Sequence, residues 1–223
     1  ASSNYANLNP LTNDNFWDNV AISKDGLRLA AVSTQADTSI YIFDLASNPV
    51  SGVKYQLYIP TTAQGGGSTG GVLYADALAW DAYGEYLMYD AYNELPSQTG
   101  NLGYWDINFL RAWNNSTNDF GDGQIFTLFS GLDPGVSVGN PVFSKNSPYI
   151  MAFEYLDANT GELSIYGANI ETGDIGLISA NNQYLGYPEF TVADNAILYN
   201  VGEPPAGGSI YAVGLNADKI NGA

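Results

Sequence analysis

Residues 20–43, which read VAISKDGLRLAAVSTQADTSIYIF, contain the pattern that decides the fold. Three short apolar runs, Val20–Ile22, Leu29–Val32 and Ile40–Phe43, are separated by polar stretches, and the first of these contains an Asp-Gly pair. Short runs of this kind, bounded by Gly, Asn, Asp and Ser, are typical of antiparallel strands. The segment therefore predicts three consecutive strands of one sheet.

The same pattern returns three more times along the chain. The later copies start at Leu78–Asp81, Pro141–Ser144 and Pro188–Thr191, and each is followed by two further apolar runs. A strand-rich repeat of about 50 residues indicates a β-propeller, because a single blade cannot bury both of its faces. We predict an all-β fold: a β-propeller of about four blades with four antiparallel strands each, either complete or part of a larger ring. The predicted blades of this single domain, 1–223, are 13–62, 72–130, 136–180 and 184–215.

Three segments of the first copy follow the order of a known blade motif. They are Pro10–Thr12, with its Leu-Thr pair, Ala21–Gly26, with a Ser-x-Asp-Gly turn, and Ile40–Leu45, with Ile-Tyr-x-x-Asp-Leu. In this order they resemble a blade of the TolB-type propeller family, although Lys24 stands where the family's turn has Pro. The resemblance implies a propeller that serves as a periplasmic or surface binding module, sometimes attached to a catalytic domain elsewhere in the same polypeptide.

The two ends of the chain predict a further pairing. The last copy stops after its third strand, whereas residues 5–12 read as an outer strand that precedes the first blade. We predict that residues 5–12 complete the fourth blade, because an unpaired strand edge is otherwise left open. The strand closes the blade within one molecule or is donated to a neighbour, and donation would build a homo-oligomer.

Composition and charge restrict the partners and the location. The chain has 23 acidic and 6 basic residues and a formal net charge of −17, which disfavours nucleic acid as a partner. No apolar run approaches the roughly 20 residues needed to span a membrane, so we expect no membrane span. The start at Ala1-Ser2-Ser3 and the abundance of Asn, Gly, Ser, Thr and Tyr favour an exported protein, either extracellular, at the cell surface or periplasmic.

Two polar loops carry oxygen atoms that suit calcium. Asp119 and Asp122 lie in a Gly-rich turn, and Asp157 and Asn159 lie in a second turn. Carboxylate and amide oxygens are the ligands that Ca²⁺ prefers, so these four residues are the candidate metal ligands. The alternative for both loops is an ordinary turn. Calcium is the only cofactor that we predict, with no haem and no nucleotide.

Catalysis by familiar side chains is restricted because the sequence has no His and no Cys. Ser-His-Asp triads, Cys-His pairs and His- or Cys-ligated metals are therefore excluded within this chain. We predict that the chain is not an enzyme. A carboxylate-based glycosidase is the alternative, because Asp81, Asp90, Glu94 and Asp106 fall at strand ends of the second copy and offer an acid and its partner.

Aromatic residues divide into core and contact candidates. Tyr83, Tyr92 and Trp113 are expected in loops, where an aromatic face can contact a protein or glycan partner. Asn114 and Asn115 begin two overlapping N-glycosylation sequons. The aromatic residues expected between blades are Trp80, Tyr86, Tyr89, Phe143, Phe153 and Phe190.

These observations predict an exported, non-enzymatic β-propeller that acts as a binding or scaffolding module at the cell surface or in the periplasm. The first alternative is a self-assembling structural subunit of an extracellular filament or coat, built by strand donation. The second alternative is the carboxylate-based glycosidase.

Overall fold

The structure is a computed structural model that describes residues 11–12, 16–35, 37–63, 71–97, 100–181, 185–202 and 208–223. These residues form strands and turns, and none of them belongs to a helix long and apolar enough to cross a membrane. The prediction of an all-β fold is confirmed.

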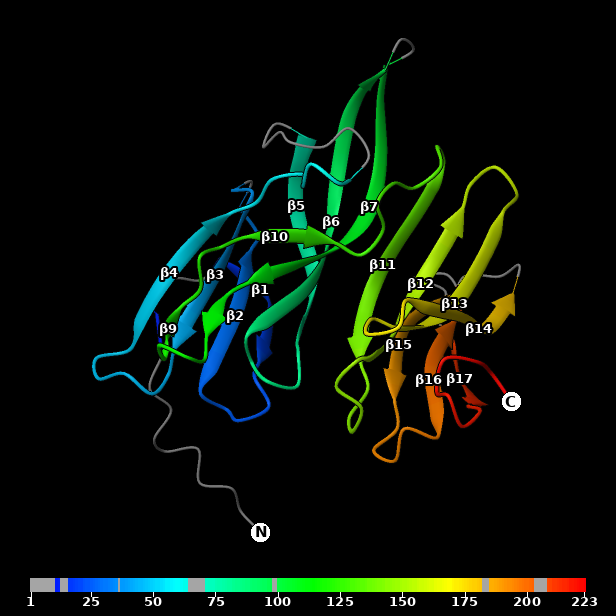
Figure 1. Cartoon of the computed structure of the whole chain (residues 1–223). Coiled ribbons are helices and arrows are strands. Elements are labelled where there is room, and N and C mark those ends of the chain that lie inside the picture. The colour runs from blue at the N-terminus through cyan, green and yellow to red at the C-terminus, as the bar shows by residue number, and fades with distance from the viewer. Residues whose placement is uncertain are drawn as a thin grey trace.

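Four antiparallel sheets follow one another along the chain and form the four blades of a β-propeller (Figure 1). Blade 1 contains β1 (Trp17–Ile22), β2 (Arg28–Ser33), β3 (Ser39–Asp44) and β4 (Ser51–Gln56). Blade 2 contains β5 (Val72–Trp80), β6 (Tyr86–Ser97), β7 (Gly100–Arg111) and β10 (Ile125–Thr127). Blade 3 contains β11 (Val136–Phe143), β12 (Ile150–Asp157), β13 (Glu162–Asn169) and β14 (Asp174–Asn181). Blade 4 contains β15 (Leu185–Phe190), β16 (Ala196–Val201) and β17 (Ser209–Gly214). A small hairpin of β8 (Trp113–Asn114) and β9 (Asp119–Phe120) lies between β7 and β10.

Apolar side chains fill the space between successive blades. Ile42 and Leu87 belong to the cluster between blades 1 and 2, and Met88 and Phe153 belong to the cluster between blades 2 and 3. A third cluster joins blades 3 and 4. Burying one such side chain contributes about 1.5–3 kcal/mol, so these interfaces hold the blades together. The aromatic residues that the sequence assigned to them and that are buried are Trp80, Tyr89, Phe143, Phe153 and Phe190, whereas Tyr86 is only half-buried.

The first turn of each blade is closed by the same hydrogen bond. The N–H of the residue that starts the turn donates to the carbonyl oxygen of the first residue of the second strand, with N···O distances of 2.9–3.0 Å. These bonds align the four blades residue by residue. The pairs are Ser23 and Arg28, Asp81 and Tyr86, Ser144 and Ile150, and Thr191 and Ala196.

Each innermost strand also contains an irregularity in its pairing with the second strand, a feature typical of β-bulges. The interruptions lie between Trp17 and Val20, Ala75 and Leu78, Gly139 and Val142, and Gly186 and Glu189. A bulge takes backbone N–H groups out of the ladder, so these groups need other acceptors.

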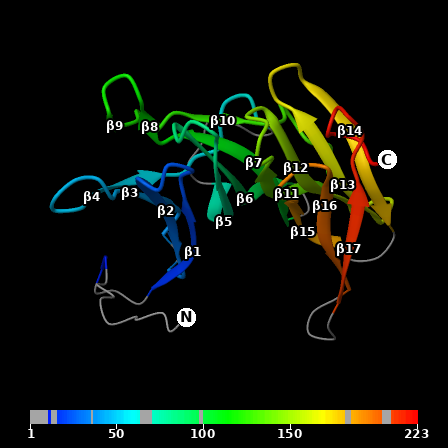
Figure 2. The ribbon, with the colours of Figure 1, turned by 90° about the horizontal axis from the view of Figure 1, so that it is seen from below.

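Blades 1 and 4 form the two ends of the series. β5 contacts blade 1, β11 contacts blade 2 and β15 contacts blade 3, but no extensive contact joins blade 4 to blade 1 within the described ranges. Seen from below, the two end blades lie on opposite sides of an arc (Figure 2). After β17 the chain folds back, and the N–H of Gly222 donates to the carbonyl oxygen of Leu177 at 3.0 Å. This C-terminal segment therefore packs beside β14.

The predicted closing strand, residues 5–12, lies outside the described residues except for Leu11 and Thr12. The indole Nε1–H of Trp17 donates to Thr12 Oγ1 at 2.7 Å. Thr12 therefore lies next to β1 of blade 1. Pairing of residues 5–10 with blade 4 stays a prediction.

Candidate functional site

An aromatic groove of about 650 Å³ lies between blades 2 and 3. Phe126 is on β10, the outer strand of blade 2, where strand alternation turns the neighbouring Ile125 into the core and leaves Phe126 exposed. The Phe126 ring lies 6.4 Å from the ring of Tyr86. The aromatic residues of the wall are Tyr83, Tyr86, Phe126, Phe129, Phe143 and Tyr149.

Two turns meet at one side of the groove. Tyr83 comes from the first turn of blade 2 and Tyr149 from the first turn of blade 3, and both side chains are exposed. A hydrogen bond with Tyr83 raises the pKa of the Tyr149 hydroxyl above its usual value. Asp81 lies at the base of the Tyr83 turn and accepts hydrogen bonds from the N–H groups of Glu85 and Tyr86 at 2.8 and 3.0 Å. The turns thus hold the two tyrosines side by side.

A central cavity of about 710 Å³ adjoins the groove. The innermost strands of all four blades contribute to its wall, and Asp81, Tyr83 and Phe143 line both hollows. Lys24 and Lys145 also line the cavity. The two hollows therefore share part of their walls: aromatic residues line the groove, and Lys24, Lys145 and Glu189 are among the residues that line the cavity.

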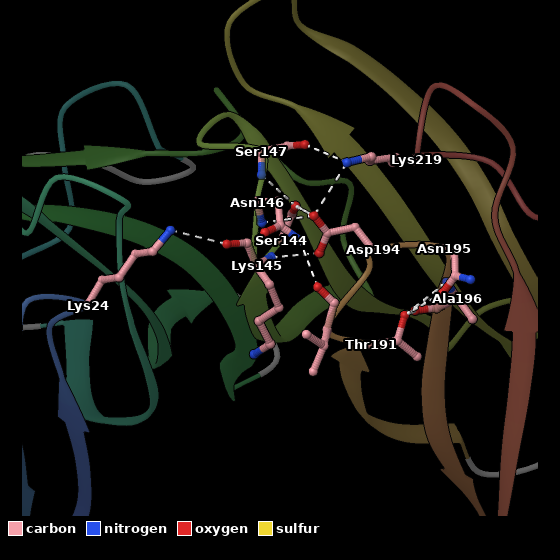
Figure 3. A network of polar contacts seen from close by, with 11 residues as sticks. Lys24, Ser144, Lys145, Asn146, Ser147, Thr191, Asp194, Asn195, Ala196 and Lys219 are labelled. Carbon is pink, nitrogen blue, oxygen red and sulfur yellow. Dashed lines mark hydrogen bonds and ion pairs between the residues drawn. The ribbon is translucent and has the colours of Figure 1, made fainter.

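A polar network fixes the wall of the cavity between blades 3 and 4 (Figure 3). The carboxylate of Asp194 is buried and accepts hydrogen bonds from Ser144 Oγ at 2.8 Å, Lys145 N at 2.7 Å and Asn146 N at 2.8 Å. Lys219 Nζ, from the C-terminal segment, lies 3.4 Å from Asp194 Oδ2. Burial by itself would raise the pKa of Asp194, but the hydrogen bonds outweigh burial and lower it. The charged carboxylate therefore ties blade 3, blade 4 and the C-terminal segment together.

Lys24 differs from the other basic residues. The five others form ion pairs, whereas no ion pair of Lys24 is found among the described residues. Its Nζ donates to the carbonyl oxygen of Lys145 at 3.3 Å, across the cavity from blade 1 to blade 3 (Figure 3). In a chain with a net charge of −17, this ammonium group is a local positive charge that attracts anionic groups.

Two carboxyl groups, one buried and one half-buried, accept hydrogen bonds from the bulges. Asp90 on β6 accepts from the N–H of Ala77 at 2.7 Å and from the N–H of Asn140 at 2.8 Å. Glu154 on β12 accepts from the N–H of Tyr187. Burial raises the pKa of Asp90 to about 6 and that of Glu154 to about 7, and the hydrogen bonds only partly offset this effect. Each carboxyl group thus reaches the bulge of the following blade.

The predicted carboxylate cluster of blade 2 does not form a single site. Asp90 lies opposite Ile107 in the ladder and Asp106 lies opposite Ala91, so Asp90 and Asp106 project from opposite faces of the sheet. Asp106 instead accepts from Thr127 Oγ1 at 3.1 Å, and burial raises its pKa to about 7. Glu94 accepts from Asn101 Nδ2 at 3.0 Å. Strand alternation therefore prevents Asp90 and Asp106 from acting as an acid and its partner across one sugar. The sequence analysis missed Glu154, whose signal was an acidic residue inside the apolar run Ile150–Leu156.

The first predicted calcium loop closes its own turn. Asp119 Oδ1 accepts from the N–H of Phe120 at 2.7 Å. Asp122 Oδ1 accepts from the N–H of Gln124 at 3.1 Å, and its Oδ2 lies 3.4 Å from Arg111 Nη1. These carboxylates therefore already have partners within the protein.

The second predicted loop is arranged in the same way. Asp157 accepts from the N–H of Asn159 at 2.8 Å and from Thr160 Oγ1 at 2.9 Å, and the bond from the Asn159 N–H lowers the pKa of Asp157. Asn159 Nδ2 donates to the carbonyl oxygen of Pro134 at 2.8 Å. No group of three or more acidic residues placed to hold a metal occurs in the part of the chain that the structure describes. Calcium binding at either loop stays a prediction.

Of the three predicted contact aromatics, only Tyr83 lines the groove. Tyr92 lies within β6 rather than in a loop, with its ring 5.6 Å from that of Tyr74 and 5.4 Å from that of Trp105. Trp113 is buried beneath the β8–β9 hairpin, where Arg28 Cζ lies 4.6 Å from its ring centre. The expectation for Trp113 was wrong because the hairpin folds this side chain onto blade 1.

The two glycosylation candidates have different surroundings. Asn115 Nδ2, the atom to which a glycan would be attached, donates to the carbonyl oxygen of Tyr83 at 3.0 Å. Asn115 Oδ1 accepts from Arg28 Nη2 at 3.4 Å. The Asn114 side chain makes a local bond, in which Oδ1 accepts from the N–H of Ser116 at 3.0 Å. Modification of Asn114 would disturb fewer contacts than modification of Asn115.

Several solved structures have a fold similar to that of this chain. The match with TolB from Acinetobacter baumannii covers 91% of this chain and 42% of the TolB chain. The sequence identity is 14% and the TM-score is 0.53. This chain has the TolB-type propeller fold. The match with a structure from a study of two prolyl endopeptidases covers 89% of this chain and 26% of the endopeptidase chain. The sequence identity is 16% and the TM-score is 0.55. The match with a puromycin-hydrolyzing peptidase from Mycobacterium tuberculosis covers 92% of this chain and 30% of the peptidase chain. The sequence identity is 12% and the TM-score is 0.55.

The resemblance to TolB-type propellers is thus confirmed at the level of the fold. Neither family models nor curated protein sequences match this chain. The chain spans less than half the length of each of these three structures.

These comparisons also correct one prediction. The absence of His and Cys led to the prediction that the chain is not an enzyme. That prediction was wrong, because the structures with the same fold include prolyl endopeptidases and a peptidase. The fold therefore occurs within enzymes, and the missing His and Cys exclude particular mechanisms rather than catalysis as a class.

Proposed function

We propose that this TolB-type propeller is a binding module whose aromatic groove receives an apolar segment of a protein partner. The observation that carries the proposal is the gathering of exposed Tyr83, Phe126 and Tyr149 around one hollow between blades. Aromatic side chains offer a large contact area at a low cost in conformational entropy, and they are enriched among residues that dominate binding energy. Apolar surface predominates over polar surface in the groove, although Thr127, Asn169 and Glu171 also line it, and this predominance favours an apolar peptide over a glycan.

The adjoining cavity adds a polar requirement. Lys24 and Tyr83 both line this cavity, and Lys24 has no ion-pair partner in the described ranges. A partner segment with an acidic residue next to its aromatic residue would therefore contact both parts of the site. We also propose a location outside the cytoplasm, either periplasmic, at the cell surface or extracellular, which the TolB-type fold and the low Lys content support.

Binding can be tested by NMR titration with the peptide amide N-acetyl-Trp-Asp-NH₂. Addition of this probe should shift the signals of Tyr83, Phe126 and Tyr149. Phe126→Ala should weaken binding by about tenfold, which corresponds to about 1.4 kcal/mol. Tyr74→Ala is the matched control, because Tyr74 is an exposed aromatic residue of the same blade that does not line the groove.

The contribution of Lys24 needs its own comparison. The neutral probe N-acetyl-Trp-Asn-NH₂ should bind several-fold more weakly than the acidic probe, and Lys24→Gln should remove this difference. If the probe shifts signals elsewhere, or if Phe126→Ala and Tyr74→Ala have equal effects, the groove is not the binding site.

A further inference from the structure

The blade alignment shows that the same position is buried in every interface between blades. The residue immediately before the first turn is Trp80 in blade 2, Phe143 in blade 3 and Phe190 in blade 4. These three side chains pack against the preceding blade and are 7%, 8% and 2% exposed. The equivalent residue of blade 1 is Ile22, and it is 59% exposed. Ile22, which lines the central cavity, is therefore not covered by a preceding blade within the described residues.

The outer face of blade 4 presents the surface that the following blade covers in blades 2 and 3. Ile107 of blade 2 and Ile165 of blade 3 lie on third strands, opposite Asp90 and Glu154, and both are 0% exposed beneath the following blade. In blade 4 the equivalent residue is Ile210, which lies opposite Asn200 and is 79% exposed. An isoleucine that is fully buried in two blades is thus left in solvent in the last one.

A polar element of the interface is repeated as well. Asp90 and Glu154 occupy the same position in their blades: each is the fifth residue of the second strand, counted from the residue that closes the first turn. Each carboxyl group accepts a hydrogen bond from the backbone N–H of a bulge residue in the following blade. Asn200 occupies this position in blade 4. The bulge residues that donate, Asn140 and Tyr187, lie four positions before their turns, and Asn19 is the equivalent in blade 1. The chain thus carries an acceptor on blade 4 and the matching donor on β1.

We propose that blade 1 of one molecule docks on the outer face of blade 4 of a second copy of this chain. Ile22 of one copy covers Ile210 of the other, and Asn200 Oδ1 accepts the N–H of Asn19. The occupant is a second copy because one chain carries both unmatched halves of an apolar contact that it already builds three times, with the hydrogen bond present in two of these interfaces. The contact is head-to-tail, so it closes into a ring or extends into a filament according to the rotation between copies.

The charge of the chain sets the conditions of assembly. Each copy brings a net charge of −17, so repulsion opposes association at low ionic strength. At 0.5 M NaCl the Debye length falls to about 4 Å, and the apolar contact then dominates. Association should therefore strengthen with salt, in contrast to an assembly held by ion pairs.

The test measures mass by light scattering after size-exclusion chromatography at 5–500 μM protein in 0.1 M and 0.5 M NaCl. The wild-type chain should give a multiple of its 23.8 kDa, with a larger fraction assembled at high salt. Ile22→Asp and Ile210→Asp should each abolish assembly. Both positions are exposed, so neither change should unfold the chain, and circular dichroism checks this. Leu73→Asp, at an exposed apolar position on β5 away from both end faces, is the control and should assemble normally.

Mixing the variants separates this contact from other kinds of association. Ile22→Asp retains an intact blade 4 face and Ile210→Asp retains an intact β1, so an equal mixture should form pairs of two chains and nothing larger. Asn200→Asp should keep assembly, as Asp90 does in blade 2, whereas Asn200→Leu should weaken it by about tenfold. A wild-type chain that stays at 23.8 kDa at 500 μM in both salts, or a mixture that stays monomeric, would overturn the proposal.

Discussion

The interface between blades 3 and 4 and the outer face of blade 4 are built from equivalent residues, yet their environments are opposite. Ile165 and Ile210 occupy the same position in successive blades, and the first is fully buried while the second is largely exposed. The difference lies entirely in whether a following blade covers the residue. Neighbours supplied by the fold, rather than residue type or local strand pattern, decide what a side chain contributes to stability.

The largest effect should come from truncating the two isoleucines. Ile165→Ala removes buried methyl groups and leaves a cavity, so the free energy of unfolding should fall by about 2–5 kcal/mol. Ile210→Ala, measured with the monomeric chain, should change it by less than about 0.5 kcal/mol. Urea denaturation at low protein concentration measures both. Equal losses for the two variants would show that blade 4 is covered within one molecule.

The polar side of the same interface should give the next largest effect. Asp194→Ala removes a buried carboxylate and leaves the N–H groups of Lys145 and Asn146 and the ammonium group of Lys219 without their acceptor. The free energy of unfolding should fall by about 3 kcal/mol. Asp174→Ala, which removes an exposed carboxylate of blade 3, is the control and should cost less than about 0.5 kcal/mol. An Asp194 variant as stable as the control would mean that the network does not hold the blades together.

A smaller effect is expected from the carboxyl groups at the bulges. The pKa of Asp90 is raised from 3.8 to about 6 and that of Glu154 from 4.5 to about 7, so the folded state binds their protons more tightly than the unfolded state. Their contribution to stability is therefore complete below the unfolded-state pKa values of 3.8 and 4.5, and it is lost as the pH rises through about 6 for Asp90 and about 7 for Glu154. Between pH 4 and pH 7, each group should account for about 2–3 kcal/mol of this loss.

Glu154→Gln should flatten that part of the pH dependence, because an amide keeps an acceptor for the Tyr187 N–H without titrating. The free energy of unfolding from urea denaturation at pH 4, 5, 6 and 7 gives the slope. Asp174→Asn removes one exposed negative charge and controls for the change in net charge. A slope that stays unchanged in Glu154→Gln would assign the pH dependence to other groups.

Much of the fold could be predicted from local pattern alone. The recurrence of three apolar runs and a turn indicated the blades, and the aromatic residues before the turns, Trp80, Phe143 and Phe190, were correctly assigned to blade interfaces. The site was predicted less well. Tyr83 was identified, but Phe126 and Tyr149 were not, because they approach Tyr83 only when blades 2 and 3 pack. Trp113 was misplaced because its partner Arg28 lies in blade 1, far away in the sequence.

The sequence by itself determined the strands, their order within each blade and the acidity of the surface, because alternation and turn chemistry act over a few neighbouring residues. Only the tertiary structure decided which faces are covered, which carboxyl groups reach a bulge in the next blade, and where the aromatic groove forms. Those properties depend on contacts between residues about 50 positions apart, and the exposed Ile22 and Ile210 show that equivalent sequence positions receive different roles when one such contact is missing.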